Sequence, residues 1–355
     1  MRLLLFAGTG GVGTTTAALA TAALAARTAK VLLVSAGVPG VPAGPAPVRL
    51  GDLQVLHVDP RRRFEERWPA VATEVALPPG VASLLTLLEA RDRALPGDWD
   101  AVLVDAPPVE ELLSLGELAG SVERVWPARE RIVHRTAFGD AVGTVQTASE
   151  AIRTFLAGAS VRLVVAPSIA GVASARRLST ALALHGYVLD SVVANRVLPA
   201  EAGDTPWASQ LRAGQQAALA ALDLGVPVLR VPHLATEPAD PASLGREIYG
   251  PADPIAPAPP VPALPVTRSG SEYELRVALP FVRRSDVRLA RSGDDLVVTV
   301  GDQLRRLALP PVLRRCVAVG ATAGDGAVRV RFRPDPDLWH RDLPVAGTHS
   351  AGGPQ

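Results

Sequence analysis

The sequence predicts an α/β domain with a doubly wound, mostly parallel sheet, followed by a small all-β antiparallel sandwich. Short apolar runs alternate with helical patterns over residues 1–250, which is the arrangement of βαβ units. Residues 251–268 are rich in proline and predict a stiff, extended linker. Beyond this linker the hydrophobic period becomes two, as in half-buried antiparallel strands. The chain is therefore expected to fold as a larger and a smaller domain.

The larger domain contains seven apolar runs that we interpret as buried parallel strands, because no two-residue hairpin turn separates them. Ligands of such sheets bind at the carboxyl ends of the strands. The glycine-rich residues 8–13, Ser35, Asp105 and Asn195 all lie at such ends, so we expect the functional site there. The seven runs are Leu3–Ala7, Val31–Ser35, Leu53–Val58, Ala101–Asp105, Val161–Ala166, Val188–Ala194 and Val226–Val231.

The smaller domain, residues 269–333, has the alternation and turn signals of an antiparallel sandwich with five or six strands. Two similar tripeptides flank it, Leu264–Val266 and Leu343–Val345, and each is suited to add an extended strand at a sandwich edge. The tail, residues 334–355, is expected to be disordered. The turn signals are Gly293-Asp294, Gly301-Asp302 and Asp325-Gly326, and the alternating apolar residues include Tyr273, Leu275, Val277, Leu279, Val328, Val330 and Phe332.

The first strand leads into a glycine-rich loop, residues 8–16, and then into an alanine-rich helical segment. Gly8 and Gly13 have the spacing of the G-x-x-x-x-G-K-[ST] phosphate loop, whose backbone N–H groups bind a phosphate at a helix N-terminus. Thr14 stands where that motif has lysine, and the only lysine of the chain is Lys30. The alternative is a glycine turn that merely packs a helix against the sheet. The candidate cofactor-binding residues of the loop are Gly8, Gly10, Gly11, Gly13, Thr14, Thr15 and Thr16.

Composition excludes several classes of function. The chain has 36 basic and 35 acidic residues, so its overall charge favours neither a nucleic acid nor a membrane surface as partner. The lone Cys316 excludes an internal disulfide and a cysteine-based zinc site within one chain. No apolar run approaches the roughly 18 residues that a membrane span needs, and the residues before the glycine loop are too few for a signal peptide. We therefore expect a cytoplasmic protein without a transmembrane segment.

Several segments, in the expected order, resemble the ArsA and Get-type ATPases over roughly residues 1–250. The loop GTGGVGTTT resembles the deviant phosphate loop of that family, usually K-G-G-V-G-K-T-T. Residues 30–35 and 53–60 resemble the second and third strands of the family, and Trp99–Pro107 resembles the strand with its acidic residue. Ala194–Pro199 is similar to the segment whose asparagine reads adenine.

The second domain resembles the α-crystallin-like domain of small heat-shock proteins, which some bacterial ArsA-type proteins carry at this position. The residues that carry this resemblance are Leu279-Pro280, 297–300, 306–310 and 326–332.

The resemblance implies that Thr15 and Asp105 would lie on the magnesium side of a bound nucleotide and that Asn195 would contact adenine. From the residues alone, two alternatives remain open. Asp105 could cap the helix after Pro108, and Asn195 could be a strand-end turn residue.

The departures from the family concern charge. Thr9 and Thr14 stand at its two lysine positions, its water-orienting aspartate, whose position falls near Gly37, is absent, and so are its paired zinc cysteines. A single cationic group can contribute about 10³- to 10⁵-fold to phosphoryl transfer. We therefore interpret Thr9, Thr14 and Asp105 as vestigial catalytic positions, and we expect weak binding of ATP and magnesium and no zinc.

These observations predict a degenerate ATPase that acts as a binding, regulatory or chaperone-like protein. The alternative is an active ATPase that serves anion transport or membrane-protein targeting. A partitioning ATPase is disfavoured by the appended sandwich. The expected partners are a second copy or a lysine-bearing paralogue, together with protein clients.

Overall fold

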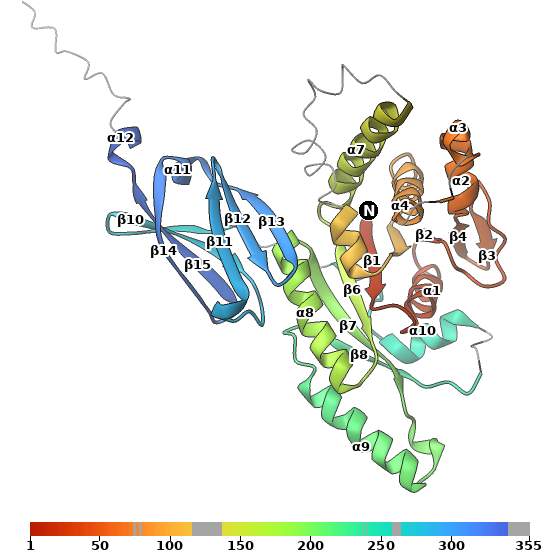
Figure 1. Ribbon diagram of the computed structural model, residues 1–355. Coiled ribbons are helices and arrows are strands. Elements are labelled where there is room, and N and C mark those ends of the chain that lie inside the picture. Colours follow the sequence, from red (N-terminus) through yellow and green to blue (C-terminus); the bar gives the residue numbers. More distant parts are fainter. Residues whose placement is uncertain are drawn as a thin grey trace, which may run out of the picture. The chain divides into compact units, whose positions relative to one another are not determined.

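The protein is described from a computed structural model, in which the chain forms two compact units, Met1–Pro262 and Ala263–Gln355 (Figure 1). The structure describes residues 1–73, 76–77, 80–115, 137–236, 238, 240–257 and 264–339, without the side chains of residues 70–71, 137–146 and 338–339. The division falls within the proline-rich segment expected to be a linker. The last three residues of that segment, 266–268, already belong to a strand of the second unit, Val266–Ser269.

The first unit is built on an eight-stranded sheet with the order β3-β4-β2-β5-β1-β6-β7-β8. Every neighbouring pair is parallel except β3 and β4, which confirms the predicted doubly wound, mostly parallel architecture. The strands are β1 (Arg2–Gly8), β2 (Val31–Ser35), β3 (Val48–Leu50), β4 (Leu53–His57), β5 (Ala101–Asp105), β6 (Ser160–Val165), β7 (Val188–Val197) and β8 (Val228–Pro232).

Two details of this sheet differ from the sequence prediction. Strand β3 pairs with β4 through a two-residue turn at Gly51-Asp52, so a hairpin does occur in this domain. All of β3 is exposed, and it therefore lacks the apolar signal by which the other strands were found. Strand β7 continues beyond the predicted end at Ala194, after a break in its pairing with β8 between Ala194 and Val197.

Helices cover both faces of the sheet. On one face lie α1 (Thr14–Ala25) and α10 (Pro241–Tyr249). The other face is covered by α2 (Pro60–Arg67), α3 (Pro69–Ala72), α4 (Val81–Ala94), helical residues 109–115, α7 (Ala137–Leu156), α8 (Ile169–His185) and α9 (Pro206–Ala221), and a short η1 (Ala200–Ala202) follows β7. Helix α7 contributes Ile152 and Leu156 to the core.

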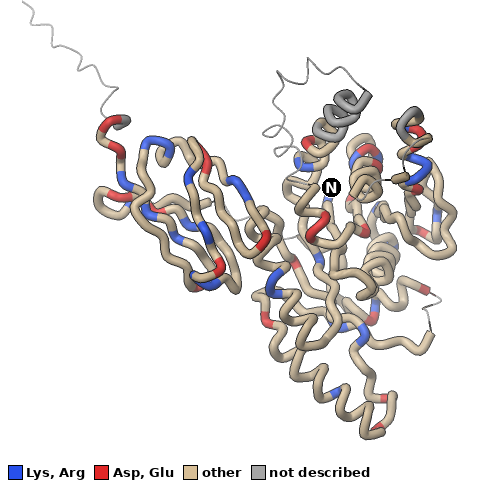
Figure 2. The backbone as a smooth tube through the Cα atoms, viewed as in Figure 1, with Lys and Arg blue, Asp and Glu red and all other residues tan. Residues whose placement is uncertain are grey.

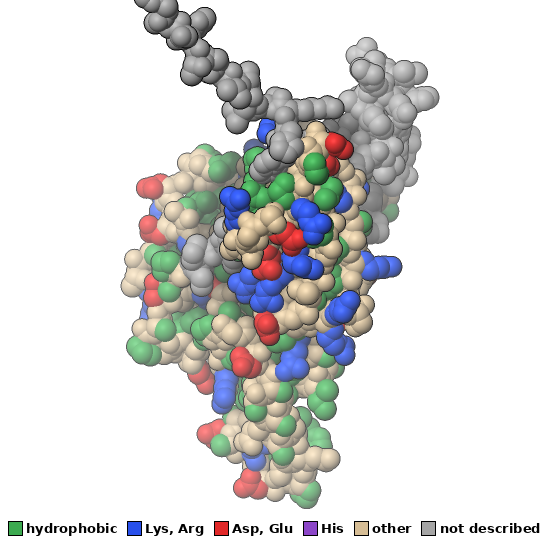
Figure 3. All heavy atoms as spheres, turned by 90° about the vertical axis from the view of Figure 1, so that its left-hand side faces the viewer, with side chains coloured by type: hydrophobic (Ala, Val, Ile, Leu, Met, Phe, Trp, Pro, Cys, Tyr) green, Lys and Arg blue, Asp and Glu red, His purple; other side chains and the backbone are tan. Residues whose placement is uncertain are grey.

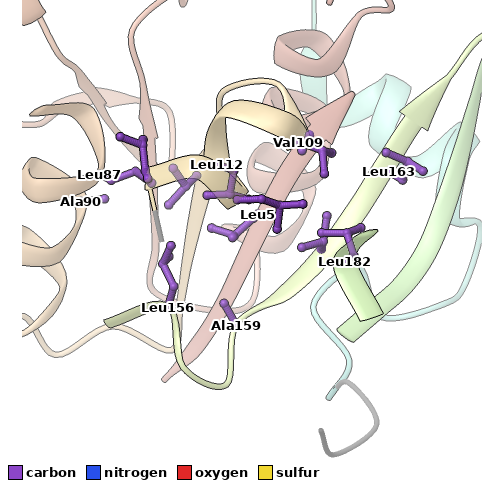
Figure 4. Packing of buried hydrophobic residues seen from close by; sticks show 14 of the residues in the cluster. Leu5, Leu87, Ala90, Val109, Leu112, Leu156, Ala159, Leu163 and Leu182 are labelled. Carbon is purple, nitrogen blue, oxygen red and sulfur yellow. The ribbon is translucent and has the colours of Figure 1, made fainter. Parts of the chain in front are cut away.

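Alternate residues of each central strand supply the two cores. On β1, Leu3 and Leu5 face the larger cluster, whereas Leu4 and Phe6 face the cluster under α1 and α10. Side chains from several elements, including Leu5, Leu112 and Leu182, converge in the larger cluster, on the face opposite α1 and α10 (Figure 4). The strands are therefore buried on both sides, which explains why they appear in the sequence as continuous apolar runs.

The second unit consists of a four-stranded sheet, β14-β15-β10-β9, and a three-stranded sheet, β11-β12-β13, both antiparallel. The predicted sandwich is confirmed, and the described residues contain seven strands rather than five or six. The elements are β9 (Val266–Ser269), β10 (Glu272–Ala278), η2 (Arg284–Asp286), β11 (Val287–Ser292), β12 (Asp295–Val300), β13 (Gln303–Ala308), α11 (Pro311–Arg314), β14 (Cys316–Gly324), β15 (Ala327–Pro334) and α12 (Pro336–Trp339).

The predicted turns and tripeptides can be placed on this unit. The turn signals join β11 to β12, β12 to β13 and β14 to β15. Of the first tripeptide, Val266 pairs with Leu275 and the Pro265 carbonyl accepts from the Arg276 N–H, so this segment does form an edge strand. Residues 334–339, which were expected to be part of a disordered tail, contain the end of β15 and helix α12, and residues 340–355 lie outside the described residues. The second tripeptide lies outside the described residues.

Charged residues of both signs occur throughout each unit (Figure 2). In the space-filling view, Lys and Arg side chains gather with acidic ones among them (Figure 3). Arg276 of β10 lies directly opposite Arg329 of β15 in the four-stranded sheet. Like charges in that position destabilise a strand pair, although Glu274 and Asp325 lie 4.0 Å and 3.7 Å from Arg329.

Candidate functional site

The glycine loop follows β1 and leads directly into α1. Gly10, Gly11 and Gly13 have φ values of 85°, 64° and 89°, a conformation that L-residues rarely adopt. Gly13 is the N-cap of α1, and no side chain caps the helix there. The N–H groups of the first helical turn are therefore left open, and together with the helix dipole they form an anion-binding position. The loop has the local geometry that its sequence predicts.

Asp105, at the end of β5, is held by hydroxyl groups from two other elements. Thr15 Oγ1 donates to Asp105 Oδ2 at 2.7 Å, and Ser35 Oγ donates to the same oxygen at 2.7 Å. The Gly37 N–H donates to Ser35 Oγ at 3.0 Å. Burial raises the pKa of the Asp105 carboxyl above its ordinary value, and the two hydroxyl hydrogen bonds oppose that rise. The structure thus brings Asp105 to Thr15 rather than to the helix start near residue 109, which was the alternative.

Asn195 connects β7 to the glycine loop. Its Nδ2 donates to the Val12 carbonyl at 2.7 Å, and its Oδ1 accepts from the Arg196 N–H at 2.9 Å. Asn195 is nearly buried, with 9% of its surface exposed. It lies within β7 where the pairing with β8 breaks, so the predicted strand end is in fact a bulge. Both polar ends of the amide are occupied by backbone groups, and the side chain fixes the position of the loop.

A cavity of about 830 Å³ lies at the carboxyl ends of the strands, in the range of small-molecule sites. Thr9, in contrast, is exposed and does not line it. Within the described lining, only Asp105 and Arg196 carry ionisable side chains. Residues of the loop, α4, α10 and the β5 end line the cavity, among them Gly8, Gly10, Gly11, Gly13, Thr14, Thr15, Thr16, Gly37, Ser83, Thr86, Asp105, Pro107, Arg196 and Leu244.

Several features of this site could not be found from the sequence. Ala82, Ser83 and Thr86 of α4 line the cavity, although nothing in their spacing indicates a ligand. Glu110, in the helical residues after β5, forms an ion pair with Arg177 of α8 at 2.8 Å. Contacts of this kind join residues far apart in the chain, and only the fold reveals them.

The geometry of the site suits a nucleotide with magnesium, but the site offers little positive charge to the phosphates, since Arg196 is the one cation of the described lining. The loop offers backbone donors, and Thr15 and Asp105 are suitable oxygen ligands for Mg²⁺. Among the described residues no group of three or more His, Cys, Asp or Glu side chains forms a metal cluster. A divalent ion would therefore depend on these two residues and on the phosphates of its ligand.

Comparison with known proteins finds relatives that match most of this chain. The model of the HSP20-like domain found in ArsA matches residues 270–332. Protein Rv2184c of Mycobacterium tuberculosis is 30% identical over 95% of this chain and 97% of its own length. The chain belongs to the ArsA-type family. A second relative of this ArsA-type chain, Uncharacterized protein SCO2128 of Streptomyces coelicolor, is 32% identical over 74% of the chain and 73% of its own length.

More distant relatives bear a functional name. The protein named "Putative arsenical pump-driving ATPase" of Chlorobaculum tepidum is 25% identical over 98% of both chains. Both parts of the predicted family assignment are thereby confirmed, the ArsA-type domain and its C-terminal HSP20-like domain. None of the helices in the described parts of this ArsA-type chain has the length and hydropathy to cross a bilayer.

Proposed function

We propose that this ArsA-type protein binds a nucleotide weakly, does not hydrolyse it at a useful rate, and acts in the cytoplasm as a binding, regulatory or chaperone-like protein. The observation that carries the proposal is a phosphate loop whose backbone geometry is complete but whose two lysine positions are Thr9 and Thr14.

Binding is supported by groups that do not depend on lysine. The uncapped N-terminus of α1 offers N–H donors, and the cavity above it is large enough for a nucleotide. When bound, ATP with magnesium would supply the phosphates and a cation next to Thr15 and Asp105. Asn195, which was predicted to contact adenine, does not line the cavity, and both ends of its amide already hold backbone groups.

Loss of hydrolysis is supported by the missing charges. Phosphoryl transfer depends on neutralising charge as it develops, and one cationic group contributes about 10³- to 10⁵-fold in rate. Thr14 offers a neutral hydroxyl at this position. Gly37 has no side chain to orient water, and its N–H is already bonded to Ser35.

An active ATPase is the second candidate. The names of three relatives favour it, since each is called a putative arsenical pump-driving ATPase. An anion pump or membrane-protein targeting would require turnover, which the absence of lysine from the loop opposes. A dimer with a lysine-bearing paralogue would reconcile the two candidates, because the partner would then supply the charge. The HSP20-like sandwich suits protein clients, and the single Cys316 suits a dimer formed without zinc.

Calorimetric titration of the full chain with ADP and ATP, with and without magnesium, tests binding, and phosphate release tests hydrolysis. We expect measurable binding and turnover at the buffer background. Thr14→Lys should strengthen binding about 10-fold or more, as expected for a new charge-assisted contact, without restoring turnover. The control is Thr28→Lys, which adds the same charge at an exposed position outside the cavity lining. Turnover that Thr14→Ala abolishes would contradict the proposal, and so would the absence of nucleotide binding.

A further inference from the structure

Arg196 is the one arginine in the described lining of the cavity, and the cavity contains no lysine. Apart from Arg196, the only ionisable side chain of this lining is Asp105, a carboxylate that repels a phosphate. An anion in the glycine loop therefore meets backbone dipoles and one negative group, and a cation is required to balance it. Arg196 is exposed, and no carboxylate within the described residues forms an ion pair with it. Its guanidinium is thus available to a ligand.

The backbone at Arg196 is unusual. Its φ of 62° lies in the left-handed region, where a residue other than glycine is held only by its surroundings. Three hydrogen bonds surround it. The Arg196 N–H donates to Asn195 Oδ1 at 2.9 Å, the Arg196 carbonyl accepts from Gln215 Nε2 at 2.9 Å, and the Leu198 N–H donates to Gln215 Oε1 at 2.7 Å. Gln215 of α9 is nearly buried.

The bulge that contains Arg196 is also tied to the loop. The adjacent Asn195 donates to the Val12 carbonyl, between Gly11 and Gly13. A β-bulge redirects a side chain relative to a regular strand, and bulges of this kind occur next to binding sites. The strained arginine is therefore fixed with respect to the loop and lines the same cavity, which a packing role alone does not require.

We propose that Arg196 supplies the positive charge for the phosphate groups of a ligand in the glycine loop, in place of the lysine that Thr14 lacks. This inference rests on the proposed nucleotide binding. A guanidinium can donate two parallel hydrogen bonds to a phosphate, and unlike lysine it keeps its charge under all ordinary conditions.

The test is calorimetric titration of the full chain with ADP, inorganic pyrophosphate and adenosine. Arg196→Gly is the informative variant, because glycine accepts the left-handed conformation without strain and removes the charge. Arg196→Lys keeps the charge but loses the paired donors. The control is Arg230→Ala, an exposed arginine on neighbouring β8 that does not line the cavity. Thermal unfolding of each variant checks that it is folded.

We expect Arg196→Gly to weaken ADP and pyrophosphate binding about 10- to 100-fold, as the loss of a charge-assisted contact should, and to leave adenosine unchanged. The affinity of Arg196→Lys for ADP and pyrophosphate should lie between those of the unmodified chain and Arg196→Gly, and Arg230→Ala should bind as the unmodified chain does. Equal binding by Arg196→Gly and the unmodified chain would overturn the inference and leave the proposed function intact. An equal loss in Arg230→Ala, or an equal loss for adenosine, would also overturn it. An unmodified chain that binds neither ADP nor pyrophosphate would overturn both.

Discussion

Gly13 lies where the glycine loop, the start of α1 and the bulge of β7 meet, and Gly13→Ala tests this junction. The φ of Gly13 is 89°. An L-residue in that region costs about 1–2 kcal/mol. An added Cβ would lie 2.1 Å from Asn195 Nδ2, so the amide must move and lose its bond to the Val12 carbonyl. That loss adds about 1–3 kcal/mol. We therefore expect the free energy of unfolding to fall by about 2–5 kcal/mol.

Gly10→Ala is the matched control for this change. Gly10 has a similar φ of 85°, but an added Cβ would meet no atom within 4 Å. It should therefore cost only the conformational part, about 1–2 kcal/mol. In a chain that already carries Asn195→Ala, the cost of Gly13→Ala should fall to that same value, because the clashing amide is gone.

Urea unfolding of the full chain, followed by tryptophan fluorescence, measures these differences as shifts of the midpoint at constant slope. The signal of Trp99 reports the first unit, since its Nε1 donates to the Arg93 carbonyl beside β5. The reasoning would be refuted if Gly13→Ala cost no more than Gly10→Ala. It would also be refuted if removal of the Asn195 side chain left the cost of Gly13→Ala unchanged.

Three further changes test other parts of the structure. Asp105→Asn should raise the thermal midpoint at pH 7, because burial raises the pKa of Asp105 in the folded protein, and the fold loses stability as the pH rises through that pKa and the carboxyl ionises. The gain from the substitution should therefore shrink towards acidic pH, whereas the control Asp52→Asn, at an exposed turn, should change the midpoint little. Gly245→Ala should destabilise the fold although alanine has the better helix propensity, because an added Cβ would lie 2.5 Å from the Ala20 carbonyl oxygen. At Gly214 an added Cβ would meet no atom within 4 Å, so Gly214→Ala should raise the free energy of unfolding in urea by about 0.5–1 kcal/mol. Arg276→Glu should stabilise the sandwich by about 0.2–1 kcal/mol, since it places opposite charges across β10 and β15, and a lower midpoint in differential scanning calorimetry would contradict this.

The sequence was sufficient where burial on both faces left a simple apolar signal. The runs of β1, β2 and β5 needed only their length and their flanking helices for assignment. Hairpin turns of the sandwich followed from glycine at positions of positive φ, such as Gly293 and Gly301. The exposed β3 had no such signal, because none of its three residues is buried.

The candidate site was predicted in its local part only. The loop and its helix follow from neighbouring residues, whereas the hydrogen bond from Ser35 to Asp105 joins residues 70 positions apart. The hydrogen bond from Asn195 to Val12 joins residues 183 positions apart, and no periodic pattern in the sequence predicts such a contact. Arg196 was part of the segment that resembles the family, but its left-handed conformation depends on Gln215 of a later helix. The cation of the cavity could therefore be recognised only in three dimensions.

Two features of the cavity oppose stability, and they support a binding role over mere packing. The Asp105 carboxyl is partly buried without a cationic partner, and its raised pKa shows that burial disfavours its charge. Arg196 adopts a conformation that is unfavourable for any residue with a Cβ. A glycine turn that only packed α1 against the sheet would need neither of them. Backbone strain and carboxyl groups with shifted pKa values concentrate at binding sites, where contacts with a ligand can offset the free energy that they cost the fold. Both residues line the same cavity, one of each sign, and a phosphate with a divalent cation is a ligand that would satisfy both.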